Sequence, residues 1–318
     1  RQQIRRLLEQ GAIHASQPVA GGQVQPASLD LRLGAVCHRV RAGFLPERCT
    51  VEERLRDLRL FTFSLEEGAI PARGHCYLVP LLDQLLSKIG PDGSERLDGM
   101  RFLDWPTAGN KPAVHAGLQA LLAMTLDAGA ELCTTLGEAA AAARCAAGAK
   151  RLRANVPDAG GSKQAAALLS LAGFGDPAAY NRDVLAVGGA KDMSTFYGYY
   201  MLEARAKAGD AQGCLDAIRT YWGAMLDRGA TSFWEDFNLD WLPGSSRIDE
   251  LPAAGEKDLH GDFGAHCYKG FRHSLCHGWA SGPAPWMIRH VLGIEVVEPG
   301  AKTVRVAPAL GDLAWAEG

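Results

Sequence analysis

The stretch TSFWEDFNLDW, residues 231–241, places acids among aromatic side chains in a way that suits sugar chemistry. Glu235 and Asp236 stand between Trp234 and Phe237. An aromatic face can cover the apolar side of a sugar ring while a carboxylate meets its hydroxyl groups. A glutamate held against tryptophan in a partly dry pocket can also serve as a general acid or base. The plainer interpretation is a solvated acid beside a core tryptophan.

Two further segments place polar side chains next to tryptophan. RFLDWPT puts Asp104 beside Trp105, and RHSLCHGWASGPAPW adds His277 and Trp279. Aspartate before a helix is commonly an N-cap, and a single histidine is commonly a hydrogen-bonded structural residue, so a structural interpretation stays open for both segments. Glycoside hydrolysis needs two carboxyl groups, one to protonate the leaving oxygen and one to activate water or attack.

Motifs of several other enzyme classes are absent from the sequence. It contains no G-x-x-x-x-G-K-[ST], no G-x-G-x-x-G after a strand, no H-E-x-x-H and no G-x-S-x-G. Cys267, His273, Cys276 and His277 are close in sequence, but their C-x5-H-x2-C-H spacing matches no common structural zinc site. We therefore expect neither a metal nor a cofactor.

The composition is that of a soluble globular chain of 318 residues, with 47% hydrophobic and 22% charged residues. A net charge of -3 gives no field that would attract nucleic acid or an anionic membrane, and no apolar run is long enough to span a bilayer. The eight cysteines include no C-x-x-C pair, and no signal-peptide pattern follows Arg1. These features favour the cytoplasm, although a sequence that begins with Arg rather than Met leaves the compartment open.

The sequence changes from mostly strand-like to helical patterns near residues 82–95, where it is rich in turn residues. Before this point, a helical pattern at residues 1–10 is followed by short alternating stretches that predict strands. After it, pairs of helical patterns predict hairpins of antiparallel helices, at 115–136 with 137–153, 162–172 with 177–187, and 194–208 with 210–228. Because no motif repeats at a fixed period, a closed helical toroid is favoured over a solenoid. From about residue 290, alternating β-branched residues predict strands.

Several of these segments together resemble a known family. RFLDWPT, HAGLQALL, TSFWEDF, SLCHGWASGPAPWMIRHVLGIEVV and GAKTVRVAPALGDLAWAEG resemble the C-terminal part of a bacterial α-L-rhamnosidase of the six-hairpin glycosidase type, over about residues 84–318. The resemblance implies a partial (α/α)6 barrel, the start of a β-sandwich, and inverting hydrolysis of rhamnose-containing glycans. Glu235 takes the place of the general base. The family positions that line the sugar pocket are matched by Asp104, Trp105, Trp234, His277 and Trp279.

The rhamnosidase resemblance is incomplete. In that family the general acid lies far upstream of the base, and counting back from Glu235 passes Arg1 before that position is reached. We therefore expect impaired hydrolysis, because inversion needs the acid as well as the base. The early barrel helices are also expected to be missing, so exposed barrel faces predict self-association.

The beginning of the chain resembles a different family. QVQPASLDLRLGAVCHRVRAGFLPERCTVEERLRDL followed by GHCYLVPLL resembles the opening of a bacterial dCTP deaminase, of the dUTPase-like β fold. That family's triphosphate-binding and catalytic residues come after the point where this resemblance ends. The alternatives to a rhamnosidase are therefore a dCTP deaminase and a non-catalytic sugar-binding or structural fragment. The expected chain is a mainly α chimera, with a deaminase-like fragment at 1–83, a partial barrel at 84–289 and the start of a sandwich at 290–318.

Overall fold

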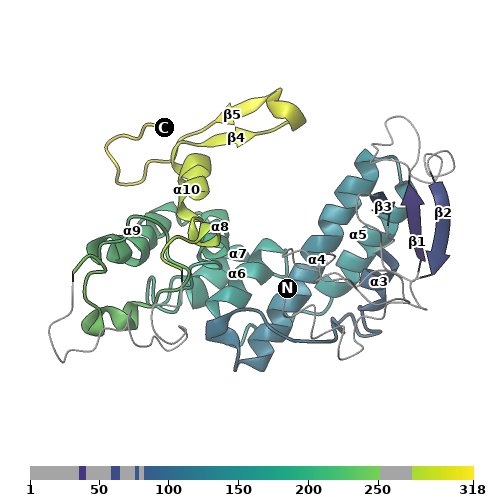
Figure 1. The fold of residues 1–318 in the computed structure, drawn as a ribbon, viewed down its shortest axis with the longest axis horizontal. Helices are drawn as coiled ribbons and strands as arrows, with labels where there is room; N and C mark the ends of the chain where they lie inside the picture. The colour runs from purple at the N-terminus through teal and green to yellow at the C-terminus, as the bar shows by residue number, and fades with distance from the viewer. Residues whose placement is uncertain (1–35, 41–58, 65–75, 79–81, 251–273) are drawn as a thin grey trace. The chain divides into compact units, whose positions relative to one another are not determined.

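The structure is a computed structural model that describes residues 36–40, 59–64, 76–78, 82–250 and 274–318. The described chain is mainly helical (Figure 1). It divides into two compact units, and each is described by itself. Unit 1 comprises Arg1–Arg96 and Leu122–Asn155, and unit 2 comprises Leu97–Leu121 and Val156–Gly318.

Unit 1 contains a three-stranded antiparallel sheet. Strand β1 (Val36–Val40) is central and pairs with β2 (Arg59–Ser64) on one side and β3 (Cys76–Leu78) on the other. The alternating patterns before residue 82 therefore form strands where the structure describes them, as predicted. The helix expected at residues 1–10 lies outside the described residues.

Unit 1 also contains α3 (Leu82–Ser87), α5 (Ala139–Arg153) and the second half of α4 (Lys111–Thr135). Gly148 lies where α5 approaches its neighbours, because a Cβ atom at this position would be 2.7 Å from a methyl carbon of Leu86. The alanines and glycines that the sequence concentrates in this helix therefore permit close packing. Arg153 of α5 forms an ion pair with Asp127 of α4, so the predicted hairpin of α4 and α5 is confirmed.

The core of unit 2 is built around α6 (Lys163–Leu171) and α8 (Gly198–Lys207), which pack against each other. The three alanines of α6 at 165–167 are fully buried, and their small side chains let the two helices approach closely. The remaining helical segments of unit 2 are η1 (Trp105–Thr107), the first half of α4, α7 (Pro177–Tyr180), η2 (Asn181–Leu185), α9 (Ala211–Asp227), η3 (Leu239–Gly244), η4 (Gly278–Ala280), α10 (Pro283–Trp286), η5 (Met287–Val291) and η6 (Pro299–Ala301).

An ion pair between the buried Arg205 and the partly buried Asp210 fixes the turn between α8 and α9. Asp210 is the N-cap of α9, and its carboxylate accepts hydrogen bonds from the Arg205 guanidinium at 2.7 and 3.0 Å and from the Gly213 N–H at 3.0 Å. A Cβ atom at Gly213 would lie 2.0 Å from Arg205 Nη2, so this position has no room for a side chain. The turn therefore sets the path by which α9 leads into the segment that carries Glu235.

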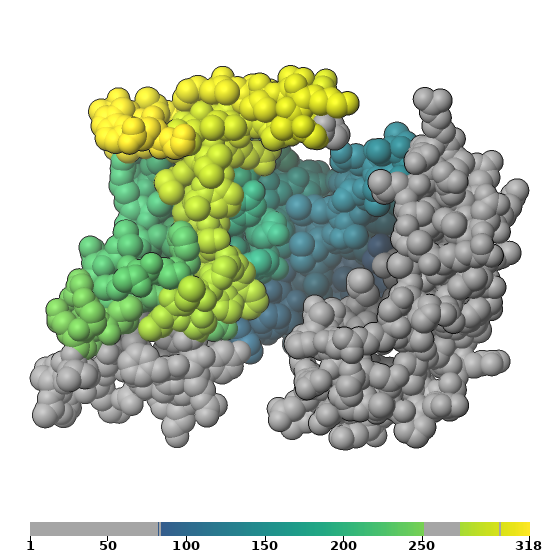
Figure 2. Space-filling view, turned by 45° about the horizontal axis from the view of Figure 1, so that its top comes forward, coloured from purple at the N-terminus to yellow at the C-terminus, as the bar shows by residue number. Residues whose placement is uncertain are grey.

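The C-terminal part of unit 2 ends in a two-stranded antiparallel sheet of β4 (Ile294–Val296) and β5 (Val304–Val306). The strands predicted from about residue 290 are thus confirmed. Figure 2 shows this segment in yellow, with much of its surface open to solvent; Val296 and Val306 are 58% and 66% exposed. None of the described helices combines the length and apolarity needed to cross a membrane.

Candidate functional site

The segment after α9 is anchored in the core by two buried aromatic side chains, Trp234 and Phe237. Trp234 and Phe237 are fully buried, and their rings meet edge to face with centroids 5.9 Å apart. The Tyr221 hydroxyl of α9 donates a hydrogen bond to the Phe237 carbonyl oxygen at 2.5 Å. These contacts hold the backbone on both sides of Glu235, whose own side chain stays one-fifth exposed.

Glu235 is also fixed by the segment that carries Ser274 and His277. Its backbone N–H donates to the Ser274 carbonyl oxygen at 2.8 Å, and its side-chain Oε2 accepts from the Ser274 N–H at 2.7 Å. The His277 N–H donates to the Phe233 carbonyl oxygen at 2.8 Å. Two segments that are far apart in the sequence, and that were both singled out for their acids, histidines and aromatics, therefore lie side by side.

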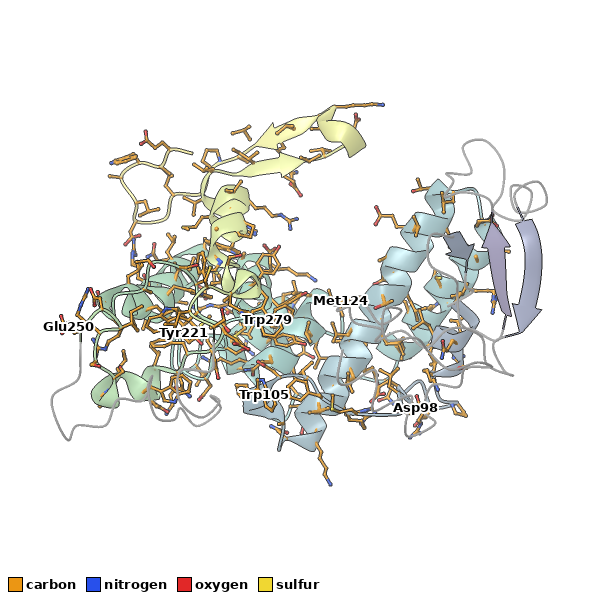
Figure 3. The ribbon with its side chains drawn as sticks, in the orientation of Figure 1. Asp98, Trp105, Met124, Tyr221, Glu250 and Trp279 are labelled. Carbon is orange, nitrogen blue, oxygen red and sulfur yellow. The ribbon has the colours of Figure 1, made fainter. Side chains whose placement is uncertain are left out.

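His277 and Trp279 lie next to the Glu235 carboxylate. The Nδ1 atom of His277 is 4.0 Å from Glu235 Oε2, and its ring meets the Trp279 indole with centroids 4.4 Å apart. Trp279 is 53% exposed (Figure 3), so its indole offers an accessible apolar surface close to a carboxylate. This is the combination that the sequence predicted for a sugar pocket.

Asp104 has a clear structural role. It is the N-cap of η1, where one carboxylate oxygen accepts from the Trp105 N–H at 2.9 Å and the other accepts from the Ser194 hydroxyl at 2.5 Å. Burial raises the pKa of this carboxyl above its ordinary value; the hydrogen bonds from Ser194 and Trp105 oppose the rise, and the nearby Asp236 carboxylate adds to it. The N-cap interpretation of Asp104 is thus confirmed, and its contact with a sugar stays a prediction.

The three residues Ser194, Thr195 and Phe196 connect the candidate site residues and were not anticipated from the sequence. The Ser194 hydroxyl bonds Asp104, and the Thr195 hydroxyl donates to the Glu235 carbonyl oxygen. The Phe196 ring lies 5.7 Å from the Trp279 ring, centroid to centroid. Neighbouring residues of one short segment therefore hold the three separate segments that carry Asp104, Glu235 and Trp279.

The two remaining tryptophans of the predicted site differ in exposure. Trp105, labelled in Figure 3, is 49% exposed by its solvent-accessible surface and packs edge to face on Phe102 with ring centroids 5.0 Å apart. Trp234 has no exposed surface, and its place in the structure is the core beneath Glu235. Trp105 is thus accessible to a ligand, while Trp234 supports the segment that carries the carboxylate.

A carboxylate arranged like that of Glu235 can accept a proton from water. Its Oε2 is held by a backbone N–H, whereas Oε1 forms no hydrogen bond within the described residues and the side chain reaches solvent. The described residues contain no group of three His, Cys, Asp or Glu side chains suited to a metal. Cys267 and His273, of the cysteine and histidine cluster considered above, lie outside the described residues.

Comparison with known proteins supports both resemblances. Residues 1–90 match the family model of the 2'-deoxycytidine 5'-triphosphate deaminase N-terminal domain. No curated protein sequence matches the chain.

Among solved structures, a GH78 family rhamnosidase of Bacillus sp. GL1 is similar over 73% of this chain, with a TM-score of 0.52 and 22% sequence identity. The match covers 25% of that chain, so this protein spans about a quarter of its relative's length. The likeness establishes that the mainly helical part shares the fold of a portion of that protein.

Proposed function

We propose that residues 84–289 form a partial (α/α)6 glycosidase barrel, that residues 290–318 begin a β-sandwich, and that the barrel binds the terminal sugar of an α-L-rhamnoside. The observation that carries this proposal is the joining of Asp104 and Glu235 by adjacent hydroxyl side chains, Ser194 and Thr195. The fold shared with part of a GH78 rhamnosidase supports it. Trp105, His277 and Trp279 supply the sugar-contacting surface, with Trp234 behind them.

Glu235 acts as the general base in this proposal. Its Oε1 takes a proton from a water molecule, and the water oxygen attacks the anomeric carbon as the glycosidic carbon–oxygen bond breaks. The leaving oxygen must gain a proton at the same time. The acid that supplies this proton in the rhamnosidase family has no counterpart among the residues matched here, so we expect slow hydrolysis.

An aryl rhamnoside and an alkyl rhamnoside provide the direct test. A nitrophenolate leaves without protonation, so a chain with the base and without the acid should cleave p-nitrophenyl α-L-rhamnoside slowly and methyl α-L-rhamnoside not measurably. Glu235→Gln should abolish the nitrophenol release, and Glu250→Gln, at an exposed glutamate, should not change it. Cleavage of both substrates at an ordinary turnover rate would show that a general acid is present and would contradict the prediction of impaired hydrolysis.

Binding without hydrolysis separates the alternatives. Calorimetric titration with L-rhamnose should show binding that Trp279→Ala weakens, and if nitrophenol release is also absent, the chain is a sugar-binding fragment.

The match of residues 1–90 to a deaminase N-terminal domain supports a second candidate function, dCTP deamination. Release of ammonia from dCTP by the purified chain would favour that function over the rhamnoside-directed one.

We also propose that the chain self-associates through exposed apolar surfaces. Val296, Val306 and Trp315 are all more than half exposed in the C-terminal segment. Burial of such side chains between two copies is favourable by roughly 25 cal/mol per Å². The double substitution Val296→Lys with Val306→Lys should lower the weight-average mass measured by sedimentation, whereas Thr303→Lys should not; an unchanged mass would place any association elsewhere.

A further inference from the structure

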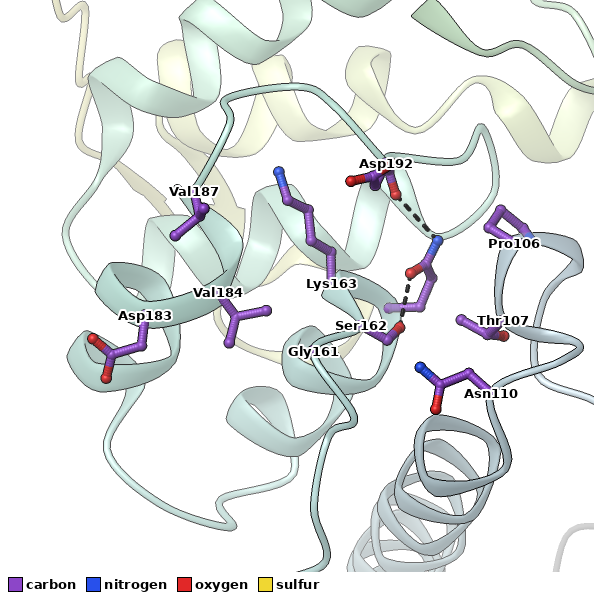
Figure 4. A pocket seen from close by; sticks show the side chains of 11 residues that line it. Pro106, Thr107, Asn110, Gly161, Ser162, Lys163, Asp183, Val184, Val187 and Asp192 are labelled. Carbon is purple, nitrogen blue, oxygen red and sulfur yellow. Dashed lines mark hydrogen bonds between the residues drawn. The ribbon is translucent and has the colours of Figure 1, made fainter. Parts of the chain in front are cut away.

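A second site of unit 2 is a pocket of about 320 Å³ between the η1 loop, the start of α6, η2 and the turn that precedes α8 (Figure 4). Its volume is at the lower end of the range that holds small molecules, roughly 300–1,000 Å³. Glu235 is not one of its lining residues. Any ligand of this pocket would therefore bind apart from the candidate catalytic carboxylate.

One wall carries a buried ammonium group. Lys163 is only 6% exposed, and its Nζ donates a hydrogen bond to the Gly189 carbonyl oxygen at 2.6 Å. Within the described residues no carboxylate forms an ion pair with it. Burial, together with the nearby Arg205 charge, lowers the pKa of Lys163 to about 8, although the Asp192 carboxylate opposes this change. A buried cation without a paired anion is unfavourable, and a bound carboxylate would relieve it.

The pocket is also lined by a negatively charged residue, Asp192, on the turn that precedes α8. Asp192 has a φ of 62°, a left-handed conformation that aspartate and asparagine tolerate better than most residues, and its carbonyl oxygen accepts from the Gln164 amide at 3.3 Å. Asp192 is exposed, and its carboxylate has no hydrogen-bond or ion-pair partner within the described part of the chain, so it can meet a ligand at the pocket mouth. The remaining charged lining residue is Asp183, and its carboxylate is paired with the Arg182 guanidinium through two hydrogen bonds.

We propose that this pocket binds a small zwitterion, an aliphatic α-amino acid, with its carboxylate at Lys163 and its ammonium at Asp192. The two protein charges line one pocket and do not form an ion pair with each other, which leaves a place for a ligand of complementary charges between them. The Asp192 carboxylate would repel a simple anion, and a simple cation would leave the buried Lys163 ammonium unmatched. The lining contains aliphatic Pro106, Val184 and Val187 and no aromatic ring, which favours an aliphatic side chain over a sugar.

The position of Lys163 in its helix adds to the attraction. Lys163 and Gln164 are the first two residues of α6, where backbone N–H groups lack partners within the helix and carry partial positive charge. The ligand carboxylate thus meets positive charge from the side chain and from the helix end together. This proposal does not depend on rhamnoside binding.

Calorimetric titration of the full chain at pH 7 with L-valine and two derivatives tests both charges. L-valine should bind, while N-acetyl-L-valine and L-valinamide, which each lack one charge, should bind about tenfold more weakly or not at all. Lys163→Met and Asp192→Asn should each weaken L-valine binding by about tenfold. Asparagine suits the left-handed backbone at position 192, so this variant remains informative if Lys163→Met fails to fold.

Matched controls and competing ligands decide the outcome. Lys191→Met removes an exposed neighbouring charge, and Asp183→Asn removes a lining carboxylate that Arg182 already satisfies; both should leave L-valine binding unchanged. Equal binding of N-acetyl-L-valine would show a plain carboxylate site and overturn the proposal. Absence of L-valine binding, or binding of L-rhamnose that Lys163→Met abolishes, would overturn it too.

Proton uptake provides a second readout. A lysine whose pKa is lowered to about 8 is partly neutral at pH 8, and a bound carboxylate raises that pKa, so binding at pH 8 should take up protons. Arg205, Asp192 and Asp183 are the other charged groups around Lys163. The measured enthalpy should therefore vary with the ionisation enthalpy of the buffer in the parent chain and not in Lys163→Met.

Discussion

Replacement of Trp234 by alanine is expected to lower the free energy of unfolding by about 3–5 kcal/mol, the range for large-to-small changes at buried aromatic residues. The indole has no exposed surface and packs edge to face on Phe237, which is itself buried. Its removal leaves a cavity that the surrounding side chains cannot fill. Because Trp234 precedes Glu235, the same change should displace the carboxylate and abolish any nitrophenol release.

Urea unfolding followed by circular dichroism measures this loss, and Trp105→Ala is the matched control. Trp105 is also a tryptophan beside an acidic residue, but it is 49% exposed, so its removal should lower the free energy of unfolding by less than about 1 kcal/mol. Equal losses in the two variants would contradict the distinction between a supporting and an accessible tryptophan. A small loss in both would show that the segment around Glu235 is not anchored by the core.

The helical hairpins could be predicted from the sequence because their signal is local. Apolar residues at helical spacing, with short polar breaks, place α4 with α5 and α8 with α9 close to their observed bounds. One difference concerns the start of α8. The helix expected from residue 194 begins only at Gly198, and the residues before it, Ser194 and Thr195, donate their hydroxyl groups to other segments.

The connections within the candidate site could not be predicted in the same way. Ser194 and Thr195 form part of no motif, and their partners Asp104 and Glu235 lie 90 and 40 residues away in sequence. Hydrogen bonds over such separations depend on how the helices pack, which periodicity does not report. The same holds for Lys163, which in the sequence is an ordinary lysine at a helix start and in the structure is buried beside a pocket.

The sequence also could not assign different roles to residues of the same kind. Trp105, Trp234 and Trp279 each stand close to an acid or a histidine in sequence, and all three are matched to pocket positions by resemblance. Only packing separates the buried Trp234 from the two exposed indoles. Asp104 likewise combines an N-cap with a raised carboxyl pKa, and the cause of that rise, burial among unit 2 side chains, is a property of the fold.

Replacement of Asp210 by alanine is expected to lower the free energy of unfolding by about 3 kcal/mol at pH 7, the lower end of the range for breaking a buried ion pair. The change leaves the Arg205 guanidinium, whose side chain is 8% exposed, without its carboxylate partner. It also removes the cap of α9 and the hydrogen bond from the Asn181 amide at 3.0 Å. Thermal and urea unfolding of this variant measure the loss of stability. The result also bears on the candidate site, because α9 leads into the segment that carries Glu235.

The pH dependence of this loss identifies its origin. Burial would raise the pKa of Asp210, but the hydrogen bonds from Arg205 and Asn181 outweigh it and hold the pKa below its ordinary value. The unfolded group titrates at about 3.9, so its stabilisation is complete above that pH and is lost as the pH falls through the lower folded value. The difference between the parent chain and Asp210→Ala should therefore shrink in acid.

Two variants separate the charge of Asp210 from its cap. Asp210→Asn keeps an oxygen that can cap α9, so it should lose less than Asp210→Ala. Asp183→Ala breaks an ion pair in which both side chains are more than half exposed, and it should lower the free energy of unfolding by less than about 1 kcal/mol. If Asp210→Ala loses no more stability than Asp183→Ala, or if its loss does not shrink in acid, the turn between α8 and α9 is not held by the pair of Arg205 and Asp210.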